Sequence, residues 1–527
     1  MSARANPSAP STRSARTEPS ADVLVVGAGP TGLLLAGDLA ASGVNVVLLE
    51  RRSTESNLTR AFAVHARTLE VFDARGLAEA LIATGHLIDG VRLFGRMAID
   101  LTRLETRFPG VLMTPQYHVE RLLEERAVAA GADIRRGVRC TGLRQDADGV
   151  ELDVEEADGT ARTLRARYAV GTDGVHSTVR RALGMPFPGR AVLDSVMLAD
   201  VRLAAAPREL PAFRGGAEGF AFVVPFGDGW FRIIAWRRGT RLPTDAPVDL
   251  EDLKGVTRAL FGTDFGVHDA RWTSRFHSDE RQVPRYRDGR VFLAGDAAHV
   301  HSPAGGLGMN AGIQDAANLG WKLAAVLQGR AGEALLDSYH DERHPVGTQV
   351  LRVSGAIVRA VLFDSPLIRG VRDVATRVLP FAPAVGRRMA RTVSGLAVAY
   401  PAPPGSHPLT GRRVPDLPLV EAGDGPTRLY EALRAGTHLR VLPRDTGPDV
   451  PPAPPGALTV TRADAERTAL LVRPDGYVES AEELPPSWSL PEAGTGAEAG
   501  AGGTVEAGEE PTASAGPEAA ERNAVVA

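Results

Sequence analysis

Three glycines near the beginning of the chain, Gly27, Gly29 and Gly32, have the spacing of a phosphate-binding turn. In such a turn the first glycine permits a tight bend, the second lets a phosphate approach the backbone, and the third lets a helix pack on a strand. The free N–H groups at the start of that helix offer partial positive charge to the phosphates. We therefore expect these glycines, with Thr31 between them, to bind the pyrophosphate of a dinucleotide.

The residues around this turn predict a strand, a helix and a second strand. Residues 22–26 and 44–49 are short apolar runs, and residues 33–41 have apolar residues on one side. Glu50 follows the second run, where its carboxylate can accept hydrogen bonds from ribose hydroxyls. Arg51 could contact the pyrophosphate or be a solvated surface charge. A strand–turn–helix without a ligand is the alternative, but Glu50 favours a dinucleotide site.

The apolar pattern predicts further elements that would position a site. Helices are predicted over residues 61–83 and 119–130. Residues 220–226 and 230–236 are rich in aromatic and apolar residues and are separated by Gly-Asp-Gly, which predicts a β-hairpin of an antiparallel sheet. A short buried strand is predicted at 291–294, and a glycine-rich loop follows it.

Two later motifs join the glycine turn and carry a family resemblance. Residues 171–180 read GTDGVHSTVR, and residues 289–310 read GRVFLAGDAAHVHSPAGGLGMN. Together the three motifs resemble those of the single-component (class A) FAD-dependent aromatic hydroxylases. Within that family they are most similar to the aromatic-polyketide hydroxylases and the rifampicin monooxygenases. The resemblance covers residues 22–400 and extends weakly to residue 480.

The resemblance implies both a fold and an activity. The fold would be an α/β FAD-binding domain of the Rossmann-like, glutathione-reductase type, an antiparallel β-sheet substrate domain and a C-terminal thioredoxin-like domain. The activity would be that of a monooxygenase that consumes NADPH or NADH. It would use O₂ to hydroxylate a polycyclic aromatic substrate of the polyketide type, through a C4a-hydroperoxyflavin.

Composition and resemblance together predict the domain boundaries. A disordered leader is expected at 1–20 and a disordered tail at 481–527, because both have few large apolar residues. The FAD-binding domain is expected at 21–85, 116–189 and 286–400, and the last of these parts would include a helical extension. The substrate domain is expected at 86–115 and 190–285. The thioredoxin-like domain is expected at 401–480. Relatives usually continue with a final helix where this chain has an Ala/Gly/Glu-rich tail, which leaves the completeness of the last domain open.

The resemblance also assigns FAD contacts outside the glycine turn. Asp296 would bind the ribityl chain, and the 303–310 loop would present backbone N–H groups to the pyrimidine edge of the flavin. Leu307 stands where many relatives have Gln, but the loop would act through its backbone. The other implied FAD contacts are Arg60 beside the isoalloxazine, Gln116, Leu143 through its backbone, Asp173, Gly306, Gly308, Met309 and Asn310.

The GTDGVHSTVR motif is linked in the family to both FAD and nicotinamide binding. Asp173 and Gly174 belong to it, and Arg180 would be its cationic part. A purely structural pair of Asp173 with Arg180 is the alternative.

Phe220, Phe222 and Trp236 are candidates for the wall of the substrate pocket, with ordinary core packing as the alternative. The flavin supplies the difficult chemistry in this family. No acid/base residue is therefore assigned, and Arg60, next to the flavin, is the one candidate for a catalytic role.

Several other functions are disfavoured by composition. His299 and His301 lack carboxylates or cysteines at ligand spacing, so no metal site is expected. The single cysteine, Cys140, allows no intrachain disulfide or CxxC pair and fits a cytoplasmic location. The net charge of −4 gives no basic field for nucleic acid. No apolar run approaches the roughly 18 residues of a membrane helix.

Two rival functions use the same motifs. A Baeyer–Villiger oxygenase on this scaffold would attack a ketone rather than an aromatic ring, and a non-catalytic FAD-binding protein would turn over nothing. A flavin-dependent halogenase is disfavoured because its WxWxIP motif is absent. The expected partners are a small aromatic substrate and O₂. The choice between NADPH and NADH, and between monomer and homodimer, stays open.

Overall fold

The fold is described from a computed structural model of the chain. It describes residues 21–54, 61–93, 97–216, 218–226, 228–362, 383–447, 450 and 452–483. The leader predicted at 1–20, nearly all of the tail predicted from 481 and Arg60 lie outside the described residues. None of the helices in the described ranges has the length and hydropathy needed to cross a membrane.

The largest sheet has eight strands and a parallel centre. Its strand order is β17 (Arg287–Asp288), β18 (Val291–Leu293), β11 (Ala161–Gly171), β1 (Ala21–Val26), β2 (Val46–Glu50) and β8 (Asp133–Arg136), with β9 (Arg139–Gln145) and β10 (Val150–Glu155) extending from β11. The central strands are almost fully buried, as expected for parallel strands covered on both faces. The carboxyl ends of β1, β2, β11 and β18 therefore lie at one edge of the sheet.

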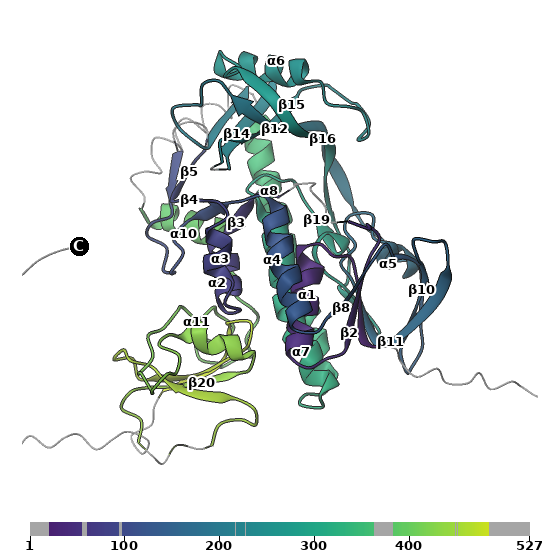
Figure 1. The fold of residues 1–527 in the computed structure, drawn as a ribbon. Coiled ribbons are helices and arrows are strands. Elements are labelled where there is room, and N and C mark those ends of the chain that lie inside the picture. The colour runs from purple at the N-terminus through teal and green to yellow at the C-terminus, as the bar shows by residue number, and fades with distance from the viewer. Residues whose placement is uncertain are drawn as a thin grey trace, which may run out of the picture.

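Three helices run side by side through the middle of the molecule (Figure 1): α1 (Pro30–Ala41), α4 (Gln116–Ala129) and α7 (Leu307–Leu327). Helix α1 connects β1 to β2, which confirms the predicted strand–helix–strand unit. Close packing depends on small residues: a Cβ built on Gly320 of α7 would lie 3.3 Å from the Asp38 Cβ of α1.

A six-stranded sheet, antiparallel throughout, lies at the top of the view in Figure 1, beneath α6 (Leu250–Phe261). Its order is β13 (Ala212–Gly216), β14 (Gly219–Pro225), β15 (Phe231–Arg237), β12 (Gly189–Leu203), β16 (Val267–Gln282) and β19 (His299–Val300). The predicted hairpin is confirmed by the β14–β15 pairing. Because β19 follows the GDAA sequence, this sheet is joined directly to the later glycine-rich motif.

The prediction of a helix over the whole of 61–83 is wrong at its beginning. The segment starts as β3 (Ala63–His65), which pairs with β7 (Val111–Met113), and only then continues as α2 (Ala66–Asp73) and α3 (Ala78–Ile82). Pairing with a distant strand overrides the local pattern here. The smaller elements nearby are β4 (His86–Ile88), β5 (Gly90–Leu93), β6 (Met97–Asp100), α5 (Thr178–Ala182) and the 3₁₀ turn η1 (Gly295–Ala297).

The long helix α8 (Ala334–Leu362) and the shorter helix α10 (Pro383–Val393) precede the last part of the chain. We call the described residues between 407 and 483 the C-terminal unit. It contains α11 (Leu429–Ala432), the 3₁₀ turn η3 (Leu433–Ala435) and four strands, β20 (Leu439–Leu442), β21 (Leu458–Thr461), β22 (Thr468–Val472) and β23 (Val478–Glu483), in the order β21-β20-β22-β23.

The C-terminal unit docks on α2 through buried ion pairs (Figure 1). Arg413 donates to Glu70 Oε2 over 2.7 Å, and Arg428 donates to Asp73 Oδ1 over 2.8 Å. Both carboxylates are almost fully buried. Because buried charges are costly without partners, the unit and α2 depend on each other.

Candidate functional site

The glycine turn divides into two tightly packed positions and one open position. Gly27 has a φ of +109°, and a Cβ built on it would lie 2.6 Å from the Thr172 carbonyl oxygen. A Cβ on Gly32 would lie 2.6 Å from Thr172 Oγ1 and closer still to the Gly27 carbonyl oxygen. A Cβ on Gly29 would meet no atom within 4 Å. Only the middle glycine therefore faces open space, as an approaching pyrophosphate requires.

Helix α1 leaves its first N–H groups available. Its N-cap residue is Gly29, which has no side chain to cap them. The first N–H groups of a helix have no partners within the helix, and together with the helix dipole they favour an anion. The open side of the turn is thus also its electropositive side.

Glu50, at the carboxyl end of β2, supports the same turn. Its Oε2 accepts a hydrogen bond from the Ala28 N–H over 2.8 Å, and its Oε1 accepts two from Arg52 over 2.9 Å. Burial raises the pKa of Glu50, but the hydrogen bonds from Arg52 and Ala28 outweigh it, so the pKa lies below its ordinary value. Oε2 keeps a lone pair for a ribose hydroxyl. Arg51 lies exposed beside it.

The three sequence motifs meet at this edge of the sheet. A Cβ built on Gly27 would lie 2.9 Å from the Asp173 Cα, so the first turn touches the second motif. Thr31 reaches the third motif, because its Oγ1 lies 2.7 Å from a Cβ built on Gly295. Thr31 therefore packs α1 against the turn that carries Asp296.

Asp296 lies in η1, directly after β18, and is exposed while its neighbours are buried. Its Oδ1 lies 4.0 Å from a Cβ built on Gly308, in the first turn of α7. The carboxylate is therefore exposed between the end of a strand and the beginning of a helix, at the edge of the sheet where the three motifs meet. We use the word groove for this surface between Gly29, Glu50, Asp173, Asp296 and the loop before α7.

The loop before α7 has the geometry for backbone recognition. Gly305 and Gly306 have φ values of +86° and +64°, and the Gly306 N–H donates to the Pro303 carbonyl over 2.9 Å. Gly306 is the N-cap of α7 and has no side chain to cap it. The N–H groups from Leu307 to Met309 are thus the ones available to a ligand. The Met309 side chain packs against the core.

The Asn310 side chain forms hydrogen bonds within the protein. Its Oδ1 accepts from the His65 N–H, and its Nδ2 donates to the Ala63 and Gly306 carbonyls, each over 2.8 Å. The imidazole of His65 contacts the Gly305 carbonyl over 2.9 Å, and burial lowers its pKa to about 4. The side chains of Asn310 and His65 therefore clamp the loop before α7 to β3.

Gln116 begins α4 and holds the segment that follows Arg60. Its Oε1 accepts from the Ala61 N–H over 3.0 Å, and its Nε2 donates to Glu120 over 2.7 Å. Glu120, which the sequence did not single out, is buried, and burial raises its pKa to about 7. Leu143 lies half-buried in β9.

In the second motif, Asp173 caps α5. Its Oδ2 accepts from the Thr178 N–H over 2.6 Å, while its buried Oδ1 has no hydrogen-bond partner within the described chain. Burial raises its pKa above the usual value. Arg180 donates to the Val175 and Ala297 carbonyls over 2.6 and 2.9 Å, and so links this motif to the turn of Asp296. The unsatisfied Oδ1 leaves one acceptor for a ligand.

The candidate substrate residues share one face of the six-stranded sheet. Phe220 lies opposite Trp236, with ring centroids 6.0 Å apart, and Phe222 lies 6.3 Å from Phe62, next to β3. These aromatics pack in one apolar cluster with residues of β3 and of the loop before α7. The alternate residues of β14, Ala221 and Val223, pack beneath α6 instead. The aromatic face therefore points toward β3 and the loop before α7.

The two histidines of the third motif have protein partners. His299 contacts Asp315 Oδ2 over 2.7 Å, and His301 Nδ1 contacts the Ser302 carbonyl over 2.7 Å. Asp315 was missed by the sequence reasoning. No sequence signal marked it, because at helical spacing Asp315 lies on the opposite side from the apolar residues Ile313, Ala316 and Ala317, where a charged residue is ordinary.

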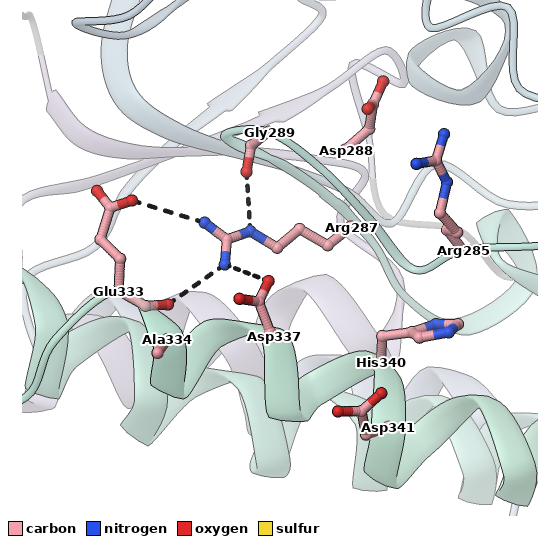
Figure 2. Close-up of a pocket in the computed structure, with 9 residues that line it drawn as sticks. All are labelled: Arg285, Arg287, Asp288, Gly289, Glu333, Ala334, Asp337, His340 and Asp341. Atoms are coloured by element: carbon pink, nitrogen blue, oxygen red, sulfur yellow. Dashed lines mark hydrogen bonds and ion pairs between the residues drawn. The ribbon is translucent and has the colours of Figure 1, made fainter.

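A separate surface pocket of about 510 Å³ lies between the β17 hairpin and the beginning of α8 (Figure 2). Arg287 crosses it and donates to Asp337 over 2.8 Å and to the Gly289 carbonyl over 2.9 Å. None of the residues predicted for the site lines this pocket.

Two family models and several known proteins match this chain. The FAD binding domain family matches residues 20–354, and the aromatic-ring hydroxylase C-terminal family matches residues 407–495. A rifampicin monooxygenase from Streptomyces venezuelae is 42% identical over 88% of this chain and 96% of its own length. A 12-dehydrotetracycline 5-monooxygenase/anhydrotetracycline 6-monooxygenase from Streptomyces rimosus is 41% identical over 87% and 94%.

Solved structures show the same fold. The anhydrotetracycline hydroxylase from Streptomyces rimosus superposes with a TM-score of 0.78 and 38% identity, covering 88% of this chain and 96% of that one. An aromatic hydroxylase from angucycline biosynthesis gives a TM-score of 0.77 with the same identity and coverage. One curated relative has a different activity: a dialkyldecalin synthase from Streptomyces rugosporus is 34% identical over 90% of this chain and 96% of its own length.

Proposed function

Because the chain belongs to the family of aromatic-ring hydroxylases with an FAD-binding domain and is a flavin-dependent monooxygenase, we propose that it hydroxylates a polycyclic aromatic substrate of the polyketide type. NADPH or NADH would be the reductant and O₂ the oxidant. The observation that carries the proposal is the convergence of three motifs around the open side of Gly29. A bound flavin, once reduced, supplies the activated oxygen.

The residues of the groove fit FAD by the chemistry of their donors and acceptors. Gly29 and the first N–H groups of α1 would hold the pyrophosphate, with Arg51 nearby, and Glu50 would accept from the adenosine ribose. Asp296 would accept hydrogen bonds from the ribityl chain. The remaining proposed contacts are Gln116, Leu143, Asp173, Gly306, Gly308, Met309, the backbone of Asn310 and, outside the described residues, Arg60.

The loop before α7 would bind the pyrimidine edge of the flavin. The N–H groups at the beginning of α7 have no side-chain cap and carry the positive end of the helix dipole. Donors at this place would stabilise negative charge on the reduced ring, as oxyanion donors do. The clamp of Asn310 and His65 supports this role, because it fixes the loop without using those N–H groups.

The substrate would lie between this loop and the aromatic face of Phe220, Phe222 and Trp236. An apolar wall excludes water and offers ring faces for an aromatic ligand to stack on. Because the substrate needs only to be held near the oxygen, no acid/base pair of the protein is required.

The finer fold assignments are part of the proposal. The parallel order β18-β11-β1-β2-β8 supports a glutathione-reductase-type FAD domain over 21–85, 116–189 and 286–400. The six-stranded sheet supports a substrate domain over 86–115 and 190–285. The order β21-β20-β22-β23, with β20 and β21 parallel, supports an incomplete thioredoxin-like domain over 401–480. It would not be redox active, because its sequence has no cysteine.

Two further expectations accompany this function. The single, buried Cys140 supports a reducing cytoplasm as the location. Monomer and homodimer are both compatible with the groove, since every residue proposed to bind FAD comes from one chain.

The proposal is tested by purifying the protein, recording its visible spectrum and following NADPH and NADH oxidation with anthraquinone, angucyclinone and naphthacene compounds. We expect a flavin spectrum and faster oxidation with at least one compound that carries a phenol. The product would be heavier by one oxygen atom, with a new ring hydroxyl rather than a lactone. A colourless protein that takes up no FAD would contradict the proposal.

A further inference from the structure

One buried carboxylate holds both ends of the turn that carries Asp296. Asp315 of α7 is 1% exposed. Its Oδ2 accepts a hydrogen bond from the Gly295 N–H over 3.1 Å and contacts His299 Nε2 over 2.7 Å. Because Gly295 and His299 flank Asp296, the turn cannot shift without breaking one of these bonds.

The other oxygen of Asp315 continues the contact to α8. Oδ1 accepts from Arg343 Nε over 2.7 Å, and Arg343 also donates to the Ala311 carbonyl over 3.2 Å. Burial opposes ionisation of Asp315, but Arg343 and His299 outweigh it and hold its pKa below the usual value. The carboxylate is therefore charged, and its three bonds are charge-assisted.

The contacts go on from Arg343 to the C-terminal unit. Arg343 donates to the Tyr400 hydroxyl over 3.2 Å, and the Tyr400 ring lies 4.1 Å from the ring of Tyr477. Arg473 of the same unit lies 5.0 Å from the Tyr400 ring and donates to Glu342 of α8 over 2.8 Å. An unbroken series of buried contacts thus joins the turn of Asp296 to the C-terminal unit.

We propose that Asp315 is a positioning residue for the cofactor, and that the C-terminal unit strengthens cofactor binding through Tyr400 and Arg343. This inference rests on the proposed function, because it assumes that Asp296 binds FAD. The C-terminal unit would then affect FAD binding although none of the residues proposed to contact FAD belongs to it. A charged group binds its ligand more weakly when the hydrogen bonds that hold the group in place are removed.

The test measures FAD release from the purified holoprotein, by the recovery of FAD fluorescence after dilution, together with the visible spectrum and Tm. Asp315→Asn should weaken FAD binding on the order of tenfold or more, since a charge-assisted bond is lost. Tyr400→Phe, which changes only a hydroxyl, should weaken it about threefold. The matched control is Asp200→Asn, another buried carboxylate that pairs with a buried arginine, Arg232, but lies in the six-stranded sheet and not against the C-terminal unit. It should lower Tm but change FAD affinity less than about twofold.

The outcomes separate a positioning role from a structural one. If Asp315→Asn lowers Tm but keeps the FAD affinity and spectrum of the parent, the positioning role is overturned. If Asp200→Asn weakens FAD binding as much as Tyr400→Phe does, the effect is a general loosening of the fold, and the specific route through Tyr400 and Arg343 is overturned. If Asp315→Asn fails to fold, Tyr400→Phe decides alone. If the unaltered protein binds no FAD, the proposed function itself is contradicted, and the inference about Asp315 falls with it.

Discussion

Gly32 lies so close to Thr172 that a Cβ built on the glycine would be 2.6 Å from the threonine Oγ1. That hydroxyl donates to the Val26 or Gly27 carbonyl, each 2.9 Å away, so it cannot turn aside without losing a bond. Gly29, three residues earlier in the same turn, has only open space beside it. The same substitution should therefore have different effects at the two positions.

Gly32→Ala should destabilise the protein by about 2 kcal/mol, because the added methyl overlaps the turn and the end of β11. Gly29→Ala should leave Tm of the FAD-free protein unchanged but weaken FAD binding on the order of tenfold, since the methyl occupies the space of the pyrophosphate. Thermal unfolding and FAD titration of both variants check this. Equal FAD affinity in Gly29→Ala and the parent would place the pyrophosphate elsewhere.

Glu120→Gln should change how stability depends on pH. Burial raises the pKa of Glu120 to about 7. Between its ordinary pKa and about 7 the folded protein binds more protons than the unfolded chain, so stability falls as pH rises through this window. The neutral amide of Gln does not ionise, so this loss of stability does not occur in the variant. Glu120→Gln should therefore stabilise the protein by up to about 3 kcal/mol near pH 8.5 and much less near pH 5. Urea unfolding at both pH values measures it. An equal effect at both would show that Glu120 is ionised throughout.

Phe222→Ala and Val223→Ala truncate neighbouring residues on opposite faces of β14. Each should lower stability by about 2 kcal/mol, because both side chains pack in apolar clusters. Only Phe222→Ala should raise KM for the compound that stimulates NADPH oxidation, because its face points toward β3 and the loop before α7. Steady-state kinetics of the two variants decide this. A similar KM in both would return Phe222 to ordinary core packing.

Glu70→Gln should release the C-terminal unit. Glu70 is 2% exposed and pairs with both Arg413 and Arg67, so the change leaves buried charges uncompensated, at a cost of about 4 kcal/mol. Thermal unfolding and limited proteolysis should show early loss of the unit. The control is Arg144→Gln, which breaks exposed pairs and should cost less than about 1 kcal/mol. Equal behaviour of the two variants would mean that the docking contact is dispensable.

The sequence predicted the features that depend on local patterns. The spacing of Gly27, Gly29 and Gly32 identified the turn because each position has its own steric demand, and the aromatic runs identified the hairpin. The strand at Ala63–His65 was read as helix, because its partner lies at Val111–Met113 and leaves no local sign.

Contacts between distant segments could not be read in the same way. The bonds of Asn310 to His65 and of Arg413 to Glu70 join residues that no spacing connects, and only the fold brings them together. The role of Asp315 was also hidden, because at helical spacing it lies opposite the apolar residues of its segment, where charged residues are ordinary. The sequence thus indicated the groups that we propose to contact the ligand, but not the groups that hold them in place.

The central claim is that the protein transfers one atom of O₂ to an aromatic ring. The most direct measurement incubates the FAD-loaded protein with NADPH, isotopically labelled O₂ and the compound that stimulates NADPH oxidation, and analyses the product by mass spectrometry. The account predicts a single labelled oxygen, located in a new ring hydroxyl. A product that forms without label, as an isomerisation or ring closure would give, would contradict it.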